Sequence, residues 1–404
     1  MTRVTQAWVR RTRAKKKWAT GEKDDAGEAA GAAATQARRR SMEVVKGGGG
    51  VPDSKFQMQA DSFTMQYRSL ETYFGGLEQF VGTPSPDILH AMEREHNSEE
   101  PFNSHNVFGT TPREEWLYVL TMEVGTRPDR MRDLTAERFE WRLDDFCQHD
   151  TARQADLLRE EVIGLRLYTG PMYVHYNNGV LRQGKKGRYV TTIHCINSAI
   201  VKLGKHQRAV QVYRGMSGGR LPDNFNDEAE MGTRGGVEAA FMSTTTNQAV
   251  AMEYASRDPT VPSVVFQIRM GMIDKGADVS WVSQFPAEEE MLFAPLTGLE
   301  VLESWMVGNV QVVELRLNTN QKNLTIEEVI GKMKRSHLDL LDLMSDDLKY
   351  SGAPDPTLLP LVSLKQEARE ISAEIFNRPA EYGAYTRRAL DTQQKVRGVC
   401  GRVV

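Results

Sequence analysis

The chain has 404 residues, of which 40% are hydrophobic, 26% charged and 8% aromatic, proportions that are ordinary for folded globular proteins. The net charge is -3, and the length allows two to three domains, or one large domain with extensions. No run approaches the roughly 18 consecutive apolar residues of a membrane span, and the first residues lack the apolar core of a secretory signal. The sequence therefore predicts neither secretion nor a membrane partner.

Residues 1–50 carry the excess of basic charge. They hold 12 Lys/Arg against 5 Asp/Glu, whereas the rest of the chain holds 39 against 49. A basic run at 10–17, an Ala/Gly-rich stretch and the tetraglycine at 47–50 cannot assemble a core, so we predict a disordered low-complexity tail. This tail is the one segment whose charge suits nucleic acid, and it leaves a nuclear or organelle address as the alternative to a cytoplasmic location.

The three cysteines, Cys147, Cys195 and Cys400, are far apart and form neither a CxxC pair nor a zinc-finger spacing. They indicate a reducing compartment, which favours the cytoplasm, and no structural metal.

Residues 51–164 are expected to form a helical lead-in, because apolar residues recur at spacings of three and four, as at Leu70, Tyr73, Phe74 and Leu77. The sequence His90, Glu93, His96 within it lacks the spacing of a metal motif. We therefore interpret these histidines as surface or capping residues.

Residues 165–317 contain short strand-like runs separated by Gly, Pro, Asp or Asn, at 209–213, 240–243, 263–270, 290–294, 299–303 and 310–317. The connections are mostly too short for repeated helical crossovers. This pattern predicts an α+β fold with an antiparallel sheet or a pair of such sheets. Residues 318–404 return to a helical pattern, with one apolar stripe from Ile326 to Met344 that packs on its own chain or, alternatively, binds a partner.

Three segments of the strand-rich region carry groups suited to catalysis. Arg214 ends an apolar run and is followed by Gly215, an arrangement that can hold a phosphate. Ser243, Thr244 and Thr245 follow a second apolar run and present hydroxyls that can orient a carboxylate or a ribose.

The third segment contains Glu288, Glu289 and Glu290 directly before an apolar run. If this segment is extended, Glu288 and Glu290 project to one face and Glu289 to the other. Two carboxylates on one face are unfavourable unless a cation lies opposite them, and a cationic substrate is one such partner. For each segment alone, an ordinary surface or capping role remains the alternative.

Taken together, the segments resemble the arginine-specific mono-ADP-ribosyltransferase family, the clostridial-toxin-like group marked by an arginine, a serine motif and Glu-x-Glu. The resemblance covers roughly 165–317. Phe285 stands where that family has its substrate-recognition aromatic, and Asn178, Leu181 and Arg182 form a weaker echo of the segment that leads into the core. The serine motif departs from many relatives in having Thr245 and Thr246 in place of serine.

The resemblance implies an ADP-ribosyltransferase-like core of two mainly antiparallel β-sheets, with the catalytic core at 165–317. The helical lead-in at 51–164 and the helical extension at 318–404 lie outside the resemblance. It implies transfer of ADP-ribose from NAD, a co-substrate, to an acceptor protein with an exposed arginine, without a metal. Glu290 would stabilise the positive charge that develops on the ribose, and Glu288 would take the acceptor's proton. The implied NAD-binding residues are Arg214, Gly215, Ser243, Thr244 and Glu290, and the implied acceptor-recognition residues are Phe285 and Glu288.

Two alternatives remain. The same fold and the same Glu290 would give an NAD glycohydrolase if water were the acceptor. The other alternative is a binding module without catalysis, which engages a partner through the basic tail or the apolar stripe at Ile326 to Met344. The presence of the arginine, the serine and both glutamates argues against the second.

Overall fold

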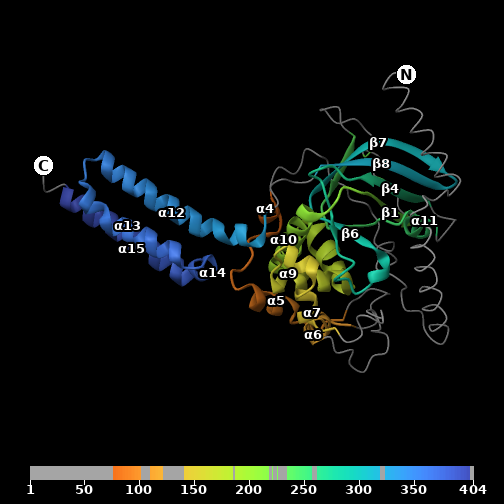
Figure 1. The fold of residues 1–404 in the computed structure, drawn as a ribbon, viewed down its shortest axis with the longest axis horizontal. Coiled ribbons are helices and arrows are strands. Elements are labelled where there is room, and N and C mark those ends of the chain that lie inside the picture. Colours follow the sequence, from red (N-terminus) through yellow and green to blue (C-terminus); the bar gives the residue numbers. More distant parts are fainter. Residues whose placement is uncertain are drawn as a thin grey trace, which may run out of the picture.

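A computed structural model describes residues 76–101, 110–121, 141–184, 187–217, 221, 225, 234–256, 262–318 and 324–400. The predicted tail at 1–50 and the first part of the lead-in lie outside these ranges. Within them, a body of helices and strands is followed by a helical extension that projects from it (Figure 1). No helix in this part of the chain has both the length and the hydropathy needed to cross a membrane.

The helices before the first strand pack around one hydrophobic core. They are α4 (Leu77–Val81), α5 (Ile88–His96), α6 (Pro112–Thr121), α7 (Leu143–Cys147), α8 (Asp150–Gln154), α9 (Arg159–Leu167) and α10 (Val190–His206), with two π-helical turns, η3 (Tyr168–Met172) and η4 (His175–Leu181). The core extends from Leu77 to Ile330 in sequence and includes Phe241 and Leu292 of the strand region. The lead-in helices are thus packed against the sheet, and α9 crosses the boundary predicted at 164.

Eight strands follow, and they confirm the α+β class. They are β1 (Gln211–Ser217), β2 (Gly235–Glu238), β3 (Met242–Thr245), β4 (Ser263–Arg269), β5 (Ala277–Asp278), β6 (Glu290–Phe293), β7 (Thr297–Val307) and β8 (Val310–Asn318). Helix α11 (Gln248–Ala255) lies between β3 and β4 in sequence. The six predicted runs correspond to β1, β3, β4, β6, β7 and β8, whereas β2 and β5 were not predicted.

The strands form a single sheet, in the order β2-β7-β8-β4-β1-β3-β6-β5, where two sheets were expected. All neighbouring strands are antiparallel except β4 and β8, so the mainly antiparallel character is confirmed. The five-strand and three-strand parts meet where β1 contacts β3, through the single register pair Tyr213 and Thr245. This narrow junction explains why a sequence pattern typical of two sheets gives one sheet with two parts.

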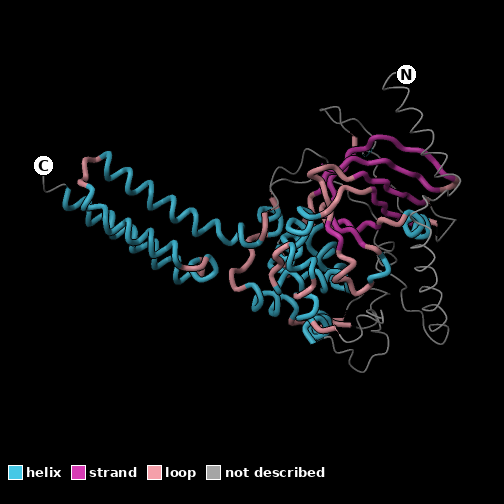
Figure 2. Tube along the Cα trace, viewed as in Figure 1, coloured by secondary structure: helices cyan, strands magenta, loops and turns pink. Residues whose placement is uncertain are grey.

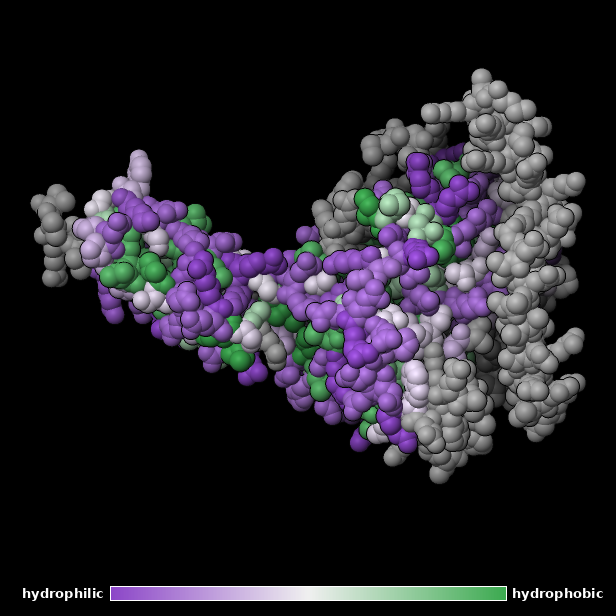
Figure 3. All heavy atoms as spheres, in the orientation of Figure 1, coloured by the Kyte–Doolittle hydropathy of each residue, from purple (hydrophilic) through white to green (hydrophobic). Residues whose placement is uncertain are grey.

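The extension consists of α12 (Ile326–Tyr350), α13 (Asp355–Glu370), α14 (Ala373–Phe376) and α15 (Pro379–Cys400), which run alongside one another away from the body (Figures 1 and 2). Helix α12 begins in the body, where Ile326 and Ile330 join the main core. Its later turns bury Leu341 and Met344 against α13 and α15. In the view of Figure 3 the surface of the extension is mostly hydrophilic, with separate hydrophobic patches.

Candidate active site

Arg214 lies on β1, beside the junction of the two parts of the sheet. Its side chain is 1% exposed, and Nη1 donates a hydrogen bond to the Ser243 carbonyl oxygen at 3.1 Å. Gly215 follows it and packs against α11, since a Cβ there would lie 1.8 Å from the Ala251 carbonyl oxygen. Only glycine allows this approach of α11 to β1, and the structure therefore gives Gly215 a packing role.

Ser243 on β3 reaches Glu290 on β6 across the sheet. The register pairs Thr245 with Glu290 and Ser243 with Leu292, so Ser243 and Glu290 are diagonal neighbours on one face. Ser243 Oγ donates to Glu290 Oε1 at 2.5 Å, and both residues are buried. Thr244 points the other way, and its hydroxyl donates to the Met291 carbonyl oxygen at 2.8 Å. Ser243 thus contacts the carboxylate, whereas Thr244 contacts the backbone.

The Glu288-Glu290 segment differs from the predicted extended conformation. Glu288 ends a short 3-10 helix, η6 (Pro286–Glu288), and Glu289 has φ 47° and ψ 48°, in the left-handed region that a non-glycine residue adopts at a cost of about 1 kcal/mol. Strand β6 begins only at Glu290. The prediction that strand alternation orients these residues is therefore wrong, because the turn orients them.

The turn nevertheless separates the middle glutamate from the other two. Glu288 and Glu290 are 7% and 1% exposed, whereas Glu289 is half-buried and accepts a hydrogen bond from Thr246 Oγ1 at 3.1 Å. Phe285 precedes η6 and is half-buried, and its backbone N–H donates a hydrogen bond to Ser283 Oγ at 2.9 Å. Phe285 and Glu288 thus belong to one compact turn.

Two tyrosines that the sequence did not single out share this site. Burial raises the pKa of Tyr168 and of Tyr173, and the negative charge of Glu290 raises both further. Glu288 also raises the pKa of Tyr173. Both carboxylates therefore act on the same phenol, which places Glu288 and Glu290 in one electrostatic environment.

Asn177 and Arg182 come from the helical segment that precedes the first strand. The Asn177 side chain accepts a hydrogen bond from the Phe241 backbone N–H at 3.2 Å and donates to the Tyr168 hydroxyl at 3.3 Å. Arg182 donates to Asn178 Oδ1 at 2.6 Å and lies 3.5 Å from the Glu238 carboxylate. The sequence pointed to Asn178 and Arg182, whereas it is Asn177 that fixes the entry to β3.

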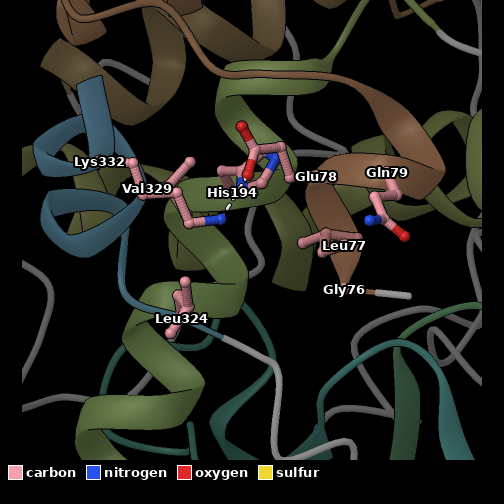
Figure 4. A pocket seen from close by; sticks show the side chains of 8 residues that line it. All are labelled: Gly76, Leu77, Glu78, Gln79, His194, Leu324, Val329 and Lys332. Atoms are coloured by element: carbon pink, nitrogen blue, oxygen red, sulfur yellow. Dashed lines mark hydrogen bonds and ion pairs between the residues drawn. The ribbon is translucent and has the colours of Figure 1, made fainter. Parts of the chain in front are cut away.

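The four signature residues, Arg214, Ser243, Glu288 and Glu290, are therefore buried around one junction. A cavity of about 410 Å³ lies elsewhere, between α4, α10 and α12 (Figure 4). It is lined by Gly76, Leu77, Glu78, Gln79, His194, Leu324, Val329 and Lys332, and none of the signature residues contributes to it. The candidate active site is therefore the group of buried charged residues at the junction, and it does not include this cavity.

Residues 148–332 match the model of a family described as ADP-ribosyltransferase exoenzyme. A solved structure of the ADP-ribosyltransferase HopU1 of Pseudomonas syringae pv. Tomato DC3000 is similar at 25% identity, over 45% of this chain and 90% of that one, with a TM-score of 0.36. A comparison with curated proteins found no match.

Two further solved structures are similar to part of this chain. The Vis toxin, an ADP-ribosyltransferase from Vibrio splendidus, is 20% identical over 45% of this chain and 86% of that one, with a TM-score of 0.33. Exoenzyme S from Pseudomonas aeruginosa, solved with human 14-3-3 protein beta and bound to carba-NAD, is 24% identical over 43% and 86%, with a TM-score of 0.32. The segment that matches the ADP-ribosyltransferase exoenzyme family model, residues 148–332, contains all four signature residues.

Proposed function

We propose that this protein is a mono-ADP-ribosyltransferase that moves ADP-ribose from NAD to arginine side chains of acceptor proteins and releases nicotinamide. The match of residues 148–332 to the exoenzyme family model supports an enzyme that uses NAD. The choice of arginine is supported by Glu288, a second buried carboxylate on the turn beside Glu290. We further propose that residues 165–317 form the catalytic unit, with helical flanks at 51–164 and 318–404, and that it acts in the cytoplasm.

The buried donors and acceptors suit the chemistry of a dinucleotide. A guanidinium at Arg214 is the usual partner of a diphosphate, and a carboxylate and hydroxyl at Glu290 and Ser243 suit ribose hydroxyls. NAD supplies a glycosidic bond from ribose to a good leaving group, nicotinamide. When this bond breaks, its electron pair leaves with nicotinamide and positive charge develops on the ribose carbon.

Glu290 is the residue that we assign to stabilising this positive charge. Its carboxylate is buried, so its field is little screened by water, and the Ser243 hydroxyl holds one oxygen at 2.5 Å. Preorganised charge of this kind needs no rearrangement during the reaction. The Ser243–Glu290 hydrogen bond between β3 and β6 is the observation that carries the proposed function.

Glu288 is assigned to the acceptor. An arginine side chain has a pKa above about 12, so its nitrogen becomes a nucleophile only as a proton is removed. As the new bond from this nitrogen to the ribose carbon forms, Glu288 accepts the proton. Phe285, three residues earlier on the same turn, would stack on the planar guanidinium.

The decisive experiment incubates the purified protein with NAD labelled in its adenylate half and with agmatine, a small guanidinium compound. We expect labelled ADP-ribosyl-agmatine and an equal amount of nicotinamide. Nicotinamide release without labelled agmatine would show a glycohydrolase, and neither product would show a binding module.

The variant Glu288→Gln separates the two half-reactions. It keeps the volume of the side chain and removes the proton acceptor, so transfer to agmatine should fall by roughly 100-fold while NAD cleavage is largely retained. Both activities are measured on one preparation. Equal loss of both would contradict the assignment of Glu288 to the acceptor.

A further inference from the structure

The loop that leads from β5 to the Phe285–Glu288 turn is bonded to the end of α9. Arg166, in the last turn of α9, donates from Nη1 to the Val282 carbonyl oxygen at 3.0 Å. In return, Gln284 Nε2 donates to the Arg166 carbonyl oxygen at 2.8 Å. Carbonyl groups in the last turn of a helix lack helical partners, and Gln284 supplies one.

Thr169 adds a third link between the two segments. Its hydroxyl accepts a hydrogen bond from the Gln284 backbone N–H at 3.2 Å and donates to the Arg166 carbonyl oxygen at 3.0 Å. Arg166, Thr169 and Gln284 are all 0% exposed. We call these three residues the turn clamp.

The surroundings leave the turn clamp little freedom. A Cβ on Gly170 would lie 2.3 Å from Gln284 Nε2, so the Gln284 amide packs directly on the Gly170 backbone. The Arg166 guanidinium lies 4.3 Å from the centre of the Phe146 ring, which provides a cation–π contact. A buried network with this many contacts holds its members in one geometry.

The turn clamp also connects the two halves of the proposed site. Gln284 directly precedes Phe285 and lies four residues before Glu288. On the helical side, Arg166 and Thr169 flank Tyr168, whose ring centre lies 5.2 Å from that of Phe241, the residue directly before β3. The clamp therefore relates the position of the acceptor-facing turn to that of the Glu290 side of the site.

We propose that Arg166, Thr169 and Gln284 are positioning residues that hold the Phe285–Glu288 turn where a guanidinium, and not water, reaches the ribose carbon. This inference rests on the proposed function. A guanidinium must be aligned with both the ribose carbon and Glu288, and misplacement by about 1 Å can cost 10²-fold in rate. Water is small and needs no such alignment, so NAD cleavage depends less on the turn.

The variant Gln284→Met tests this role, because methionine has a similar shape and cannot donate to the Arg166 carbonyl. We expect kcat/KM for agmatine to fall by about 10-fold or more, through a higher KM for agmatine, while KM for NAD and the rate of NAD hydrolysis change less than about twofold. Equal loss of both activities would overturn the proposal.

Thr169 offers a matched pair. Thr169→Val removes the hydroxyl and should reproduce the selective loss of transfer, whereas Thr169→Ser keeps the hydroxyl and should restore at least half of the wild-type transfer. As a control for stability, Thr192→Val removes a buried hydroxyl that donates to Glu95 Oε2 at 2.6 Å, remote from the turn. A selective loss of transfer in Thr192→Val would also overturn the proposal.

The wild-type protein distinguishes failure of this inference from failure of the proposed function. If wild type cleaves NAD without modifying agmatine, the assignment of arginine as acceptor is wrong. If wild type modifies agmatine and the clamp variants lose both activities together, only the positioning role is wrong.

Discussion

The sheet junction around Glu290 and the helical extension bury different kinds of group. At the junction, Arg214, Glu288 and Glu290 are charged residues at most 7% exposed. In the extension, the core between α12, α13 and α15 is apolar, and charged residues pair at the surface, as Glu367 and Arg388 do. Burying a charge costs several kcal/mol unless other groups compensate, so the charges at the junction need partners, whereas the apolar core of the extension does not.

This contrast shows where in the chain energetically unfavourable features are concentrated. Glu289, in a left-handed conformation, lies at the junction as well. Strain and buried charge together are typical of functional sites, whereas the extension follows ordinary rules of helix packing. The predictions below test this division.

The largest effect is expected from Glu290→Gln. Glutamine keeps the volume and can still accept from Ser243, but it removes the negative charge, so NAD cleavage and transfer should both fall by at least about 100-fold. Initial rates of nicotinamide release measure this loss, with thermal unfolding as the control for folding. Near-normal release would show that the buried charge at the junction is not catalytic.

The next largest effect is expected from Leu361→Ala in the extension, and it is a loss of stability, not of rate. Leu361 is 0% exposed in the α12–α13–α15 core, so the variant should lose about 2–5 kcal/mol of unfolding free energy in that region. Hydrogen exchange of 355–370 reports this loss. NAD cleavage, measured where the protein remains folded, should match wild type. A tenfold loss would show that the extension contributes to catalysis and would contradict the contrast between the two regions.

Acid should weaken both regions through buried histidines, among them His96 in the body and His337 in the extension. Burial lowers the pKa of His96 in the body to about 4 and lowers the pKa of His337 in the extension. Since the unfolded state binds the proton more readily, this part of the stability is complete above the ordinary histidine pKa near 6.5 and is lost as the pH falls towards the folded pKa. Denaturant titrations should show about 2 kcal/mol less stability at pH 5 than at pH 7.5 on account of His96.

The variant His96→Gln separates the contribution of His96 to this pH dependence of stability from that of the acidic groups that titrate in the same pH range. It should reduce the difference in stability between the two pH values by a similar amount, and an unchanged difference would rule His96 out as its source. His96 is fully buried and bonded through both ring nitrogens, to the Met92 carbonyl and the Tyr176 hydroxyl at 2.7 Å each. The prediction that it is a surface or capping residue is therefore wrong.

The smallest effect is expected from Glu367→Gln on the surface of the extension. The Glu367–Arg388 pair is about half exposed on each side, so its loss should cost no more than about 0.5 kcal/mol and should become undetectable at high salt. A cost above 1 kcal/mol, measured by denaturant titration, would mean that surface charge matters more in the extension than its packing suggests.

Much of the junction could be predicted because its chemistry lies in short, local motifs. The order and spacing of the four signature residues led to one site. In the fold, hydrogen bonds connect Arg214 to Ser243 and Ser243 to Glu290. The orientation of Glu288 could not be predicted, because a left-handed Glu289 is set by the turn and not by residue type. Tyr168 and Tyr173 were missed since they lie in a helical segment that resembles ordinary core.

Topology was harder to predict than strand identity. Strand β2 is short and begins with Gly235 and Gly236, which give no strand signal, and β5 has two residues. Whether the strands join into one sheet depends on a single pair of residues between β1 and β3, a long-range contact with no local pattern. In the extension, Pro354 is the N-cap of α13 and Pro356 lies in its first turn, where a proline is tolerated because the first N–H groups of a helix have no helical partner.

Helix α12 has 25 residues, enough for roughly 37 Å of continuous rod, and its first turn is fastened in the body. Thr325 and Glu328 close its first turn reciprocally, the Ile326 N–H donates to Ser198 on α10, and Lys202 on α10 pairs with Glu327. A rod built in at one end resists bending. Any group attached at its far end is therefore held at a fixed distance and in a fixed direction from the candidate active site, which a flexible linker would not do.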